Sequence, residues 1–253
     1  MWCAVAIVGL SACASTPDLS LPLDEKGPGP EVVRAEERIV SDCLSAFGIS
    51  VDDLRRESPN AAYLGWLGDR TSGYAGPGPG EFVLTGDARA VYEGTWEMHG
   101  GRAVPAGGCR QAVRDVLVTE KDPLLRLAYD AAEKAGKDTR IADAERRWAE
   151  CMKAKGYTYA GPFDALGDPR WAASVNVEDP PEDGGPAEIA TAADDHECRG
   201  ESGWYDRRRE IWADHQNRVI AANGPALAES RAYNTQLEAV AAKVLDGDYK
   251  RSW

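Results

Sequence analysis

The chain has 253 residues, a formal net charge of −13, 43% hydrophobic residues and 28% charged residues. This hydrophobic share is too high for a chain that is disordered throughout, and the length suits one or two domains with a buried core. The acidity argues against nucleic acid as a partner, because phosphate binding requires clustered Lys and Arg. With only three histidines, the chain is a poor candidate for a His-rich metal enzyme, and we predict no metal and no cofactor.

The amino terminus has the pattern of an export signal. Residues 4–10 are a short apolar stretch that is followed by small residues. Residues 10–13, Leu-Ser-Ala-Cys, resemble the lipobox of bacterial lipoproteins, whose cysteine receives a diacylglyceryl group and becomes the first residue after cleavage. This resemblance assigns the lipid to Cys13. Residues 1–12 contain no Lys or Arg, so we expect the true start to lie upstream of Met1; the alternative is a soluble protein whose first turn is apolar.

Four cysteines remain once Cys3 is placed in the signal and Cys13 is assigned to the lipid. In an exported chain they imply two disulfides, with three connectivities. Residues 37–48 (ERIVSDCLSAFG) and 145–156 (ERRWAECMKAKG) share the same pattern around a cysteine, and each of these cysteines precedes a later Cys-Arg pair. This repeat favours Cys43–Cys109 and Cys151–Cys198. A four-cysteine zinc site is the alternative, but no pair has the short spacing that such sites use.

Hydrophobic periodicity and helix-end signals predict mostly helices. The expected helices are Glu31–Phe47, Cys109–Val118, Pro123–Gly136, Asp138–Lys155, Pro186–Cys198, Trp204–Ala222 and Pro225–Leu245. The last two are expected to form a helical hairpin whose arms pack on each other. In the helix that ends at Cys198, we expect Ile189 and Ala193 to point inward and the acidic face to be solvated.

Residues 58–108 break this pattern, because they are rich in Gly and aromatic residues. We expect an irregular excursion that is closed by the Cys43–Cys109 bridge, with a short strand at 81–84. Aromatic side chains dominate contacts with sugars and with protein partners. The candidate binding residues are therefore Trp66, Tyr74, Tyr92 and Trp96; the alternative is that these aromatics form a satellite core of the excursion.

The predicted fold is mainly α, with two related disulfide-stapled helical units, a C-terminal αα-hairpin and an irregular Gly/aromatic-rich insertion. The predicted organisation is a signal-peptide remnant (1–12), a lipid-anchored flexible tether (13–30), a first helical unit that contains the insertion (31–136) and a second helical unit that contains the hairpin (137–253).

A resemblance covers roughly residues 140–245. Trp-x-x-Cys-Met, a nearby Gly-Tyr-x-Tyr and a Glu-Ile-Ala helix that ends in Cys resemble a group of uncharacterised secreted actinobacterial (Streptomyces-type) lipoproteins. The matching positions are Trp148, Cys151, Met152, Gly156, Tyr157, Tyr159, Glu188, Ile189, Ala190, Ala192, Asp195 and Cys198. The resemblance implies export and a helical fold, and it transfers no activity.

The sequence contains no catalytic constellation that we recognise. It has no Gly-x-Ser-x-Gly elbow, and His215 lies on an apolar helix face, which favours a structural histidine. We expect an exported cell-envelope lipoprotein, held on the outer face of the cell membrane by the Cys13 lipid, with a non-enzymatic binding or scaffolding role towards an envelope protein or cell-wall glycan. The alternatives are an envelope enzyme that acts on cell-wall glycan through Glu81 or Glu93, and an accessory subunit of a membrane transporter.

Overall fold

The computed structural model describes residues 20–51, 54, 64, 74, 82–117, 123–171, 185–251 and 253, and this part of the chain is mainly α, as predicted. The α-helices are α1 (Pro30–Ala46), α3 (Gly86–Glu93), α4 (Gly108–Leu117), α5 (Pro123–Gly136), α6 (Ala142–Ala154), α7 (Pro162–Leu166), α9 (Pro186–Glu201), α10 (Trp204–Ala222) and α11 (Gly224–Leu245). Two 3-10 turns are η1 (Asp24–Lys26) and η3 (Thr139–Ile141). Among these residues, no helix is both long enough and apolar enough to cross a bilayer.

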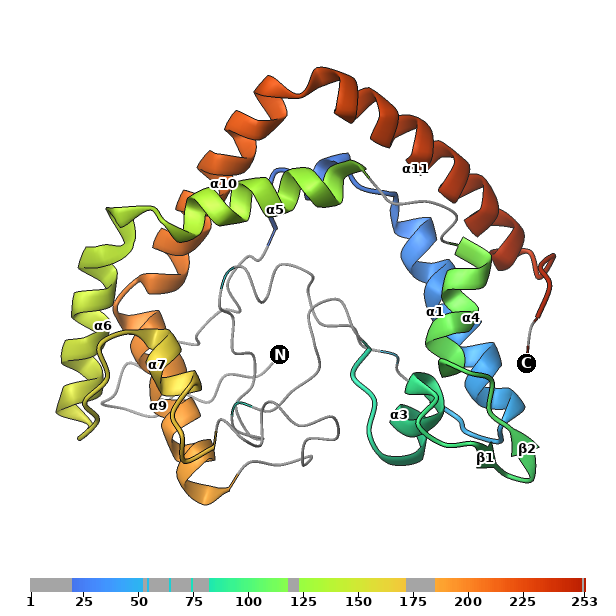
Figure 1. Ribbon diagram of the computed structural model, residues 1–253, viewed down its shortest axis with the longest axis horizontal. Coiled ribbons are helices and arrows are strands. Elements are labelled where there is room, and N and C mark those ends of the chain that lie inside the picture. The colour runs from blue at the N-terminus through green and yellow to red at the C-terminus, as the bar shows by residue number, and fades with distance from the viewer. Residues whose placement is uncertain are drawn as a thin grey trace, which may run out of the picture.

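The described helices form an arch (Figure 1). Helices α6, α7 and α9 make one leg, and α1, α3 and α4 make the other. Helices α5, α10 and α11 run across the top between them. The packing contacts agree, because α5 touches both α10 and α11, α9 touches α6 and α7, and α1 touches α3 and α4.

All seven predicted helices are confirmed, with ends that differ by a few residues. Two short helices, α3 and α7, were not predicted. The strand expected at 81–84 is not found in its described part, because Phe82 forms only a single bridge and Val83 and Leu84 are not in a strand. The sheet is instead an antiparallel pair of two-residue strands, β1 (Met98–His99) and β2 (Arg102–Ala103).

Both predicted disulfides are confirmed. Cys43–Cys109 joins α1 to α4, and Cys151–Cys198 joins α6 to α9, each with its Cα atoms 5.7 Å apart. The repeated sequence pattern therefore marks a repeated arrangement, in which a disulfide ties two helices together.

The repeat also extends to the way α1 and α6 end. Gly48 and Gly156 have φ values of +78° and +96°, a left-handed conformation that favours glycine. In both turns the next amide donates back to the carbonyl five residues earlier, from Ile49 to Leu44 at 3.1 Å and from Tyr157 to Met152 at 3.0 Å. This is the hydrogen bond of a Schellman cap, which satisfies a carbonyl at the helix end.

The C-terminal helical pair is open rather than closed. The chain turns at Asn223, but α11 then runs away from α10 along the top of the arch (Figure 1). The expected packing of the two arms on each other is replaced by packing of α10 on α5 and of α11 on α1. Helix α5 contacts both arms, and the segment that precedes α1 also packs there. Helix α10 packs on η3, α6 and α9 as well.

The end of the predicted tether is packed against the helices. Leu21 and Leu23 are 3% and 5% exposed, and they lie in apolar clusters with residues of α5 and α10. The Leu23 amide donates to Gln216 Oε1 at 2.9 Å, a buried bond to α10. The expectation of a flexible tether up to residue 30 is therefore wrong for residues 20–29, because two buried leucines anchor them. Residues 13–19 lie outside the described residues.

Removing either disulfide should destabilise the protein substantially. In the chain-entropy model a bridge that closes a loop of this size contributes about 4 kcal/mol, because it restricts the unfolded chain. The double variants Cys43→Ala/Cys109→Ala and Cys151→Ala/Cys198→Ala should each lower the free energy of unfolding by about this amount in urea denaturation. A non-reducing peptide map serves as the control that the other bridge is intact, and an unchanged urea midpoint would contradict the prediction.

Candidate functional site

The structure separates the four aromatic residues that were singled out as binding candidates. Tyr74 is 5% exposed and Tyr92 is 9% exposed, so both belong to the core. Tyr92 packs edge-on against Phe82, in the cluster that surrounds Cys43–Cys109. Trp66 lies outside the described residues. Tyr92 therefore fits the satellite-core alternative, whereas Tyr74 belongs to the core of the other leg, with Trp148 and Cys198.

Trp96 remains a candidate for external contact. It is 41% exposed and stacks on His99, with 5.3 Å between ring centroids. Met98, on β1, is 55% exposed beside them. Of the two carboxylates proposed for a glycan enzyme, Glu93 is paired with Arg89 at 3.1 Å, whereas Glu81 lies outside the described residues. Trp96 thus offers an exposed aromatic surface at the foot of one leg.

A fully buried carboxylate, Asp195 of α9, organises the other leg. Its Oδ1 accepts from Trp148 Nε1 at 2.8 Å and from Arg199 Nε at 2.7 Å. Its Oδ2 accepts from the Tyr74 hydroxyl at 3.1 Å and from Arg199 Nη2 at 2.8 Å. Asp195 is 0% and Arg199 1% exposed, so the pair is sequestered from water. A buried charge of this kind requires full hydrogen bonding, and each carboxylate oxygen here has two donors.

This arrangement corrects the orientation expected for α9. Ala193 is exposed and Ile189 only half-buried, whereas the buried face carries Glu188, Asp195 and Arg199. Arg199 also donates from Nη2 to the Pro162 carbonyl at 3.0 Å, and so connects α9 to α7. Asp and Arg four residues apart on a helix are typical of a solvated ion pair, and only the partners from other elements make this one internal.

Burial and charge act together on the ionisable groups of this cluster. Burial by itself would lower the pKa of Arg199, because it disfavours the cation. The charge and the hydrogen bonds of Asp195 together have a larger effect, so the pKa of Arg199 is raised. Burial, followed by the Asp195 charge, raises the pKa of Tyr74. The raised pKa values keep Arg199 as a cation and Tyr74 as a neutral phenol, which suits a structural role.

A second arginine extends the cluster along α10. The Arg208 guanidinium lies 3.9 Å from the Trp212 ring centroid and 5.0 Å from that of Trp204, which is within cation–π range. Burial and the nearby Arg199 lower the pKa of Arg208 to about 10, so it remains charged at neutral pH. The indole Nε1 atoms of Trp204 and Trp212 are buried and have no hydrogen-bond partner among the described residues.

The histidines of this leg have structural partners. His215 Nε2 lies 2.9 Å from Asp138 Oδ2, and this contact ties α10 to the turn after α5. His196 Nδ1 lies 3.2 Å from the Tyr205 hydroxyl. Over the described ranges, no group of three or more His, Cys, Asp or Glu side chains is placed to hold a metal ion.

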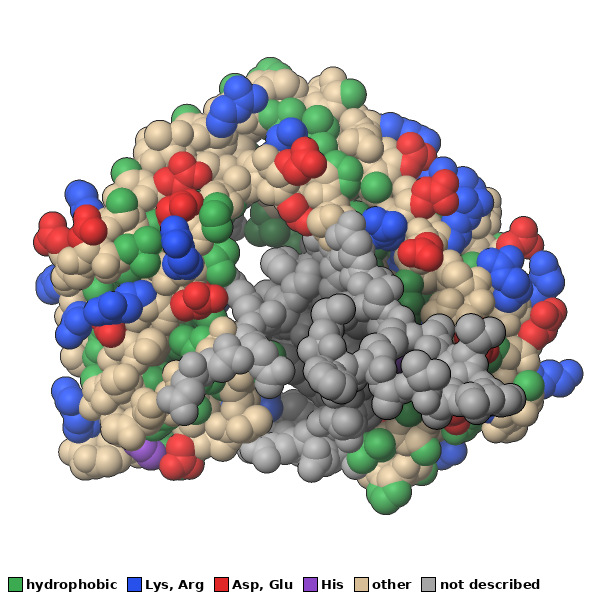
Figure 2. All heavy atoms as spheres, turned by 180° about the vertical axis from the view of Figure 1, so that it is seen from behind, with side chains coloured by type: hydrophobic (Ala, Val, Ile, Leu, Met, Phe, Trp, Pro, Cys, Tyr) green, Lys and Arg blue, Asp and Glu red, His purple; other side chains and the backbone are tan. Residues whose placement is uncertain are grey.

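Charged side chains of both signs alternate over the surface of the described helices. Figure 2 shows Lys and Arg beside Asp and Glu along the outer edge of the arch on the face that it displays. Several are helical pairs, such as Arg38–Asp42 at 3.0 Å and Arg218–Asp214 at 2.6 Å. Mixed surfaces of this kind favour solubility and do not single out one charged class of partner.

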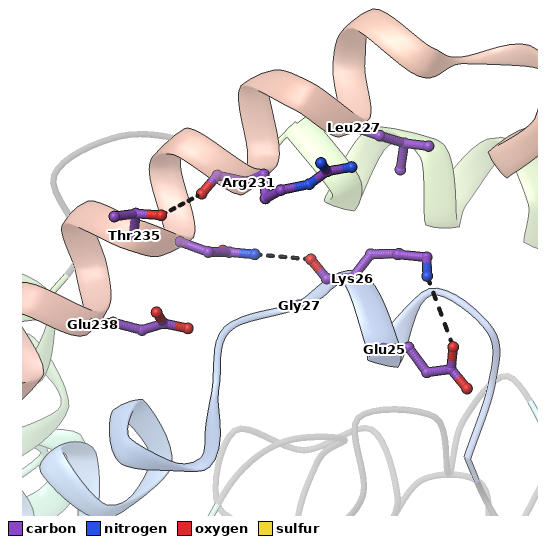
Figure 3. Close-up of a pocket in the computed structure, with 8 residues that line it drawn as sticks. Glu25, Lys26, Gly27, Leu227, Arg231, Thr235 and Glu238 are labelled. Atoms are coloured by element: carbon purple, nitrogen blue, oxygen red, sulfur yellow. Dashed lines mark hydrogen bonds and ion pairs between the residues drawn. The ribbon is translucent and has the colours of Figure 1, made fainter.

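A polar pocket of about 360 Å³ lies where the N-terminal segment meets α11 (Figure 3). Its volume falls at the lower end of the range for small-molecule sites. One wall is Glu25, Lys26 and Gly27, and the other is the face of α11 that carries Leu227, Arg231, Asn234, Thr235 and Glu238.

Hydrogen bonds hold the two walls of this pocket together. Asn234 Nδ2 donates to the Lys26 carbonyl at 2.8 Å, and the Gly29 amide donates to Glu238 Oε1 at 3.0 Å. Asn234 is 6% exposed, and its buried Oδ1 atom has no hydrogen-bond partner in the part of the chain that the structure describes. This pocket was not predicted, because residues 25–27 were expected to belong to a flexible tether.

Breaking the buried ion pair should destabilise the fold far more than breaking a neighbouring surface pair. Asp195→Asn leaves Arg199 buried without its counterion, which should lower the free energy of unfolding by about 3–5 kcal/mol. The matched control is Asp194→Asn, because Asp194 is partly exposed and pairs with Lys155 at 2.9 Å; its cost should be about 1 kcal/mol or less. Urea denaturation measures both, and equal effects would contradict the assigned role of Asp195.

The buried phenol predicts a loss of stability at alkaline pH. Because the pKa of Tyr74 in the folded state is raised above its unfolded value of about 10, its contribution is intact below that pH and is lost as the pH rises further. Tyr74→Phe should cost about 1 kcal/mol at neutral pH but should make stability above pH 10 less dependent on pH. The control is Tyr129→Phe, since Tyr129 is 57% exposed. Denaturation at a series of pH values tests this, and parallel curves for both variants would refute it.

No family model matches the chain, and neither a curated protein nor a solved structure shows significant similarity to it.

Proposed function

We propose that this chain is an exported binding protein of the cell envelope, anchored to the outer face of the cell membrane by a diacylglyceryl group on Cys13. The observation that carries the proposal is the packing of residues 20–29 against α10 and α11, a few residues after the lipobox-like motif at 10–13. Because this segment packs on α10 and α11, a lipid attached to it would keep the folded part of the chain close to the membrane.

The packed segment sets how far the body can lie from the membrane. Because an extended chain spans at most about 3.5 Å per residue, a lipid on Cys13 would hold Leu21 within about 30 Å of the membrane surface. The proposed partners are therefore molecules of the inner envelope zone, either membrane components or envelope proteins and glycan close to the membrane.

The disulfides are compatible with this location. Two bridges join α1 to α4 and α6 to α9, and such bonds persist in oxidising compartments. The resemblance of residues 140–245 to secreted actinobacterial lipoproteins supports export as well. A binding role is supported by the exposed Trp96 and by the polar pocket at α11.

Replacing the anchor cysteine tests the proposal directly. In an actinobacterial host given radioactive palmitate, the wild-type chain should be labelled and should sediment with membranes. Cys13→Ser should lose the label and appear in the medium, because no thiol remains to accept the diacylglyceryl group. Cys3→Ser is the matched control and should still be labelled. Absence of label on the wild type, or label retained by Cys13→Ser, would refute lipidation at this residue.

A further inference from the structure

The pocket between η1 and α11 carries opposite charges at its two ends. Arg231 and Lys26 reach toward the end near Leu227, whereas Glu238 lies at the other end (Figure 3). We propose that this pocket binds a small zwitterion, with its anionic group at Arg231 and Lys26 and its primary ammonium group at Glu238. This deepens the binding role proposed above by naming a ligand class.

The anion end is formed by cations that are weakly engaged within the protein. Arg231 makes no ion pair with any carboxylate in the part of the chain that is described. Lys26 meets Glu25 at 3.7 Å, and the side chain of Glu25 is 80% exposed, so solvent screens this pair strongly. A guanidinium and an ammonium group on facing walls suit a carboxylate or phosphate group.

The end of the pocket proposed for the ammonium group carries a carboxylate that accepts hydrogen bonds. Glu238 uses Oε1 to hold the Gly29 amide, and its carboxylate charge attracts a cation. Asn234 serves the pocket as a brace, because its Nδ2 donates to the Lys26 carbonyl across the two walls. A primary ammonium group has N–H donors for the Glu238 carboxylate, and a quaternary ammonium group has none.

Occupancy of this pocket would act on the anchor segment. One wall is the N-terminal segment itself and the other is α11, so a ligand in contact with both holds the segment in its packed position. The same zwitterion chemistry occurs in free amino acids and in phosphoethanolamine lipid headgroups. The binding site is therefore placed where it couples the anchor to the body.

The test uses the full-length chain with Cys13→Ser, so that its result does not depend on lipidation. Isothermal titration with O-phosphoethanolamine and with β-alanine should show saturable binding. Arg231→Gln and Glu238→Gln should each weaken binding about tenfold or more, because each removes one charged contact. The glutamine at 238 keeps an acceptor for the Gly29 amide. The control is Arg34→Gln, an exposed arginine of α1 that is outside the pocket and pairs with Glu31; it should bind as tightly as the parent chain.

The outcomes separate this proposal from its alternatives. Absence of binding by both probes, or binding that Arg231→Gln and Glu238→Gln leave unchanged, would overturn it. Inorganic phosphate that binds as tightly as O-phosphoethanolamine would show that the ammonium group contributes nothing, which would also overturn it. A refuted lipid anchor, by contrast, would appear only in the palmitate experiment.

Vesicles distinguish the two sources of the zwitterion. Vesicles of phosphatidylethanolamine should bind the same full-length chain, and vesicles of phosphatidylcholine should not, if the ligand is a lipid headgroup that donates hydrogen bonds. Binding of O-phosphoethanolamine or β-alanine without binding to either vesicle assigns the pocket to a free zwitterion. The chain could also bind both kinds of vesicle equally well, with no loss of binding in the Glu238→Gln variant. That result would overturn the role of the ammonium group.

Discussion

The buried carboxylate of Asp195 is the constraint on which one leg of the arch depends. It accepts hydrogen bonds from Trp148 on α6, from Tyr74 and from Arg199 on its own helix. Arg199 then reaches the carbonyl of Pro162 at the start of α7. Because removal of a charge from water is costly, these donors together make the burial of the carboxylate tolerable. The network therefore fixes α6, α7 and α9 relative to one another more specifically than apolar contact alone would.

The two disulfide-linked helix pairs show how one sequence pattern supports different surroundings. Both pairs share the bridge and the glycine cap that ends the first helix. Around Cys43–Cys109 the neighbours are apolar or aromatic, such as Leu44 and Phe47. Around Cys151–Cys198 the ion pair is inserted beside Trp148 and Met152. In both pairs the bridge holds two helices together. The side chains around it differ, so one leg has an apolar core and the other has a core that contains an ion pair.

The N-terminal segment links this architecture to the proposed function. Leu21 and Leu23 are buried against helices from both halves of the chain, and the following residues form one wall of the polar pocket. A force or a ligand that acts on this segment therefore acts on α10 and α11 directly. In the proposed lipoprotein, the junction of anchor and body and the candidate ligand site are the same place, which gives the pocket a role in positioning the body at the membrane.

Local features could be predicted from the sequence. They include the helices at Trp204–Ala222 and Pro123–Gly136 and, through the repeated motif, the pairing Cys43–Cys109 and Cys151–Cys198. These follow from periodicity, helix-end residues and cysteine context, which are short-range signals. Tertiary structure alone decided that Asp195 is buried, that α11 leaves α10 for α1, and that residues 20–29 are packed. The physical reason is that an Asp and an Arg four residues apart look the same in sequence whether water or another helix covers them. Only residues distant in the chain, such as Tyr74 and Trp148, supply the donors that make burial favourable.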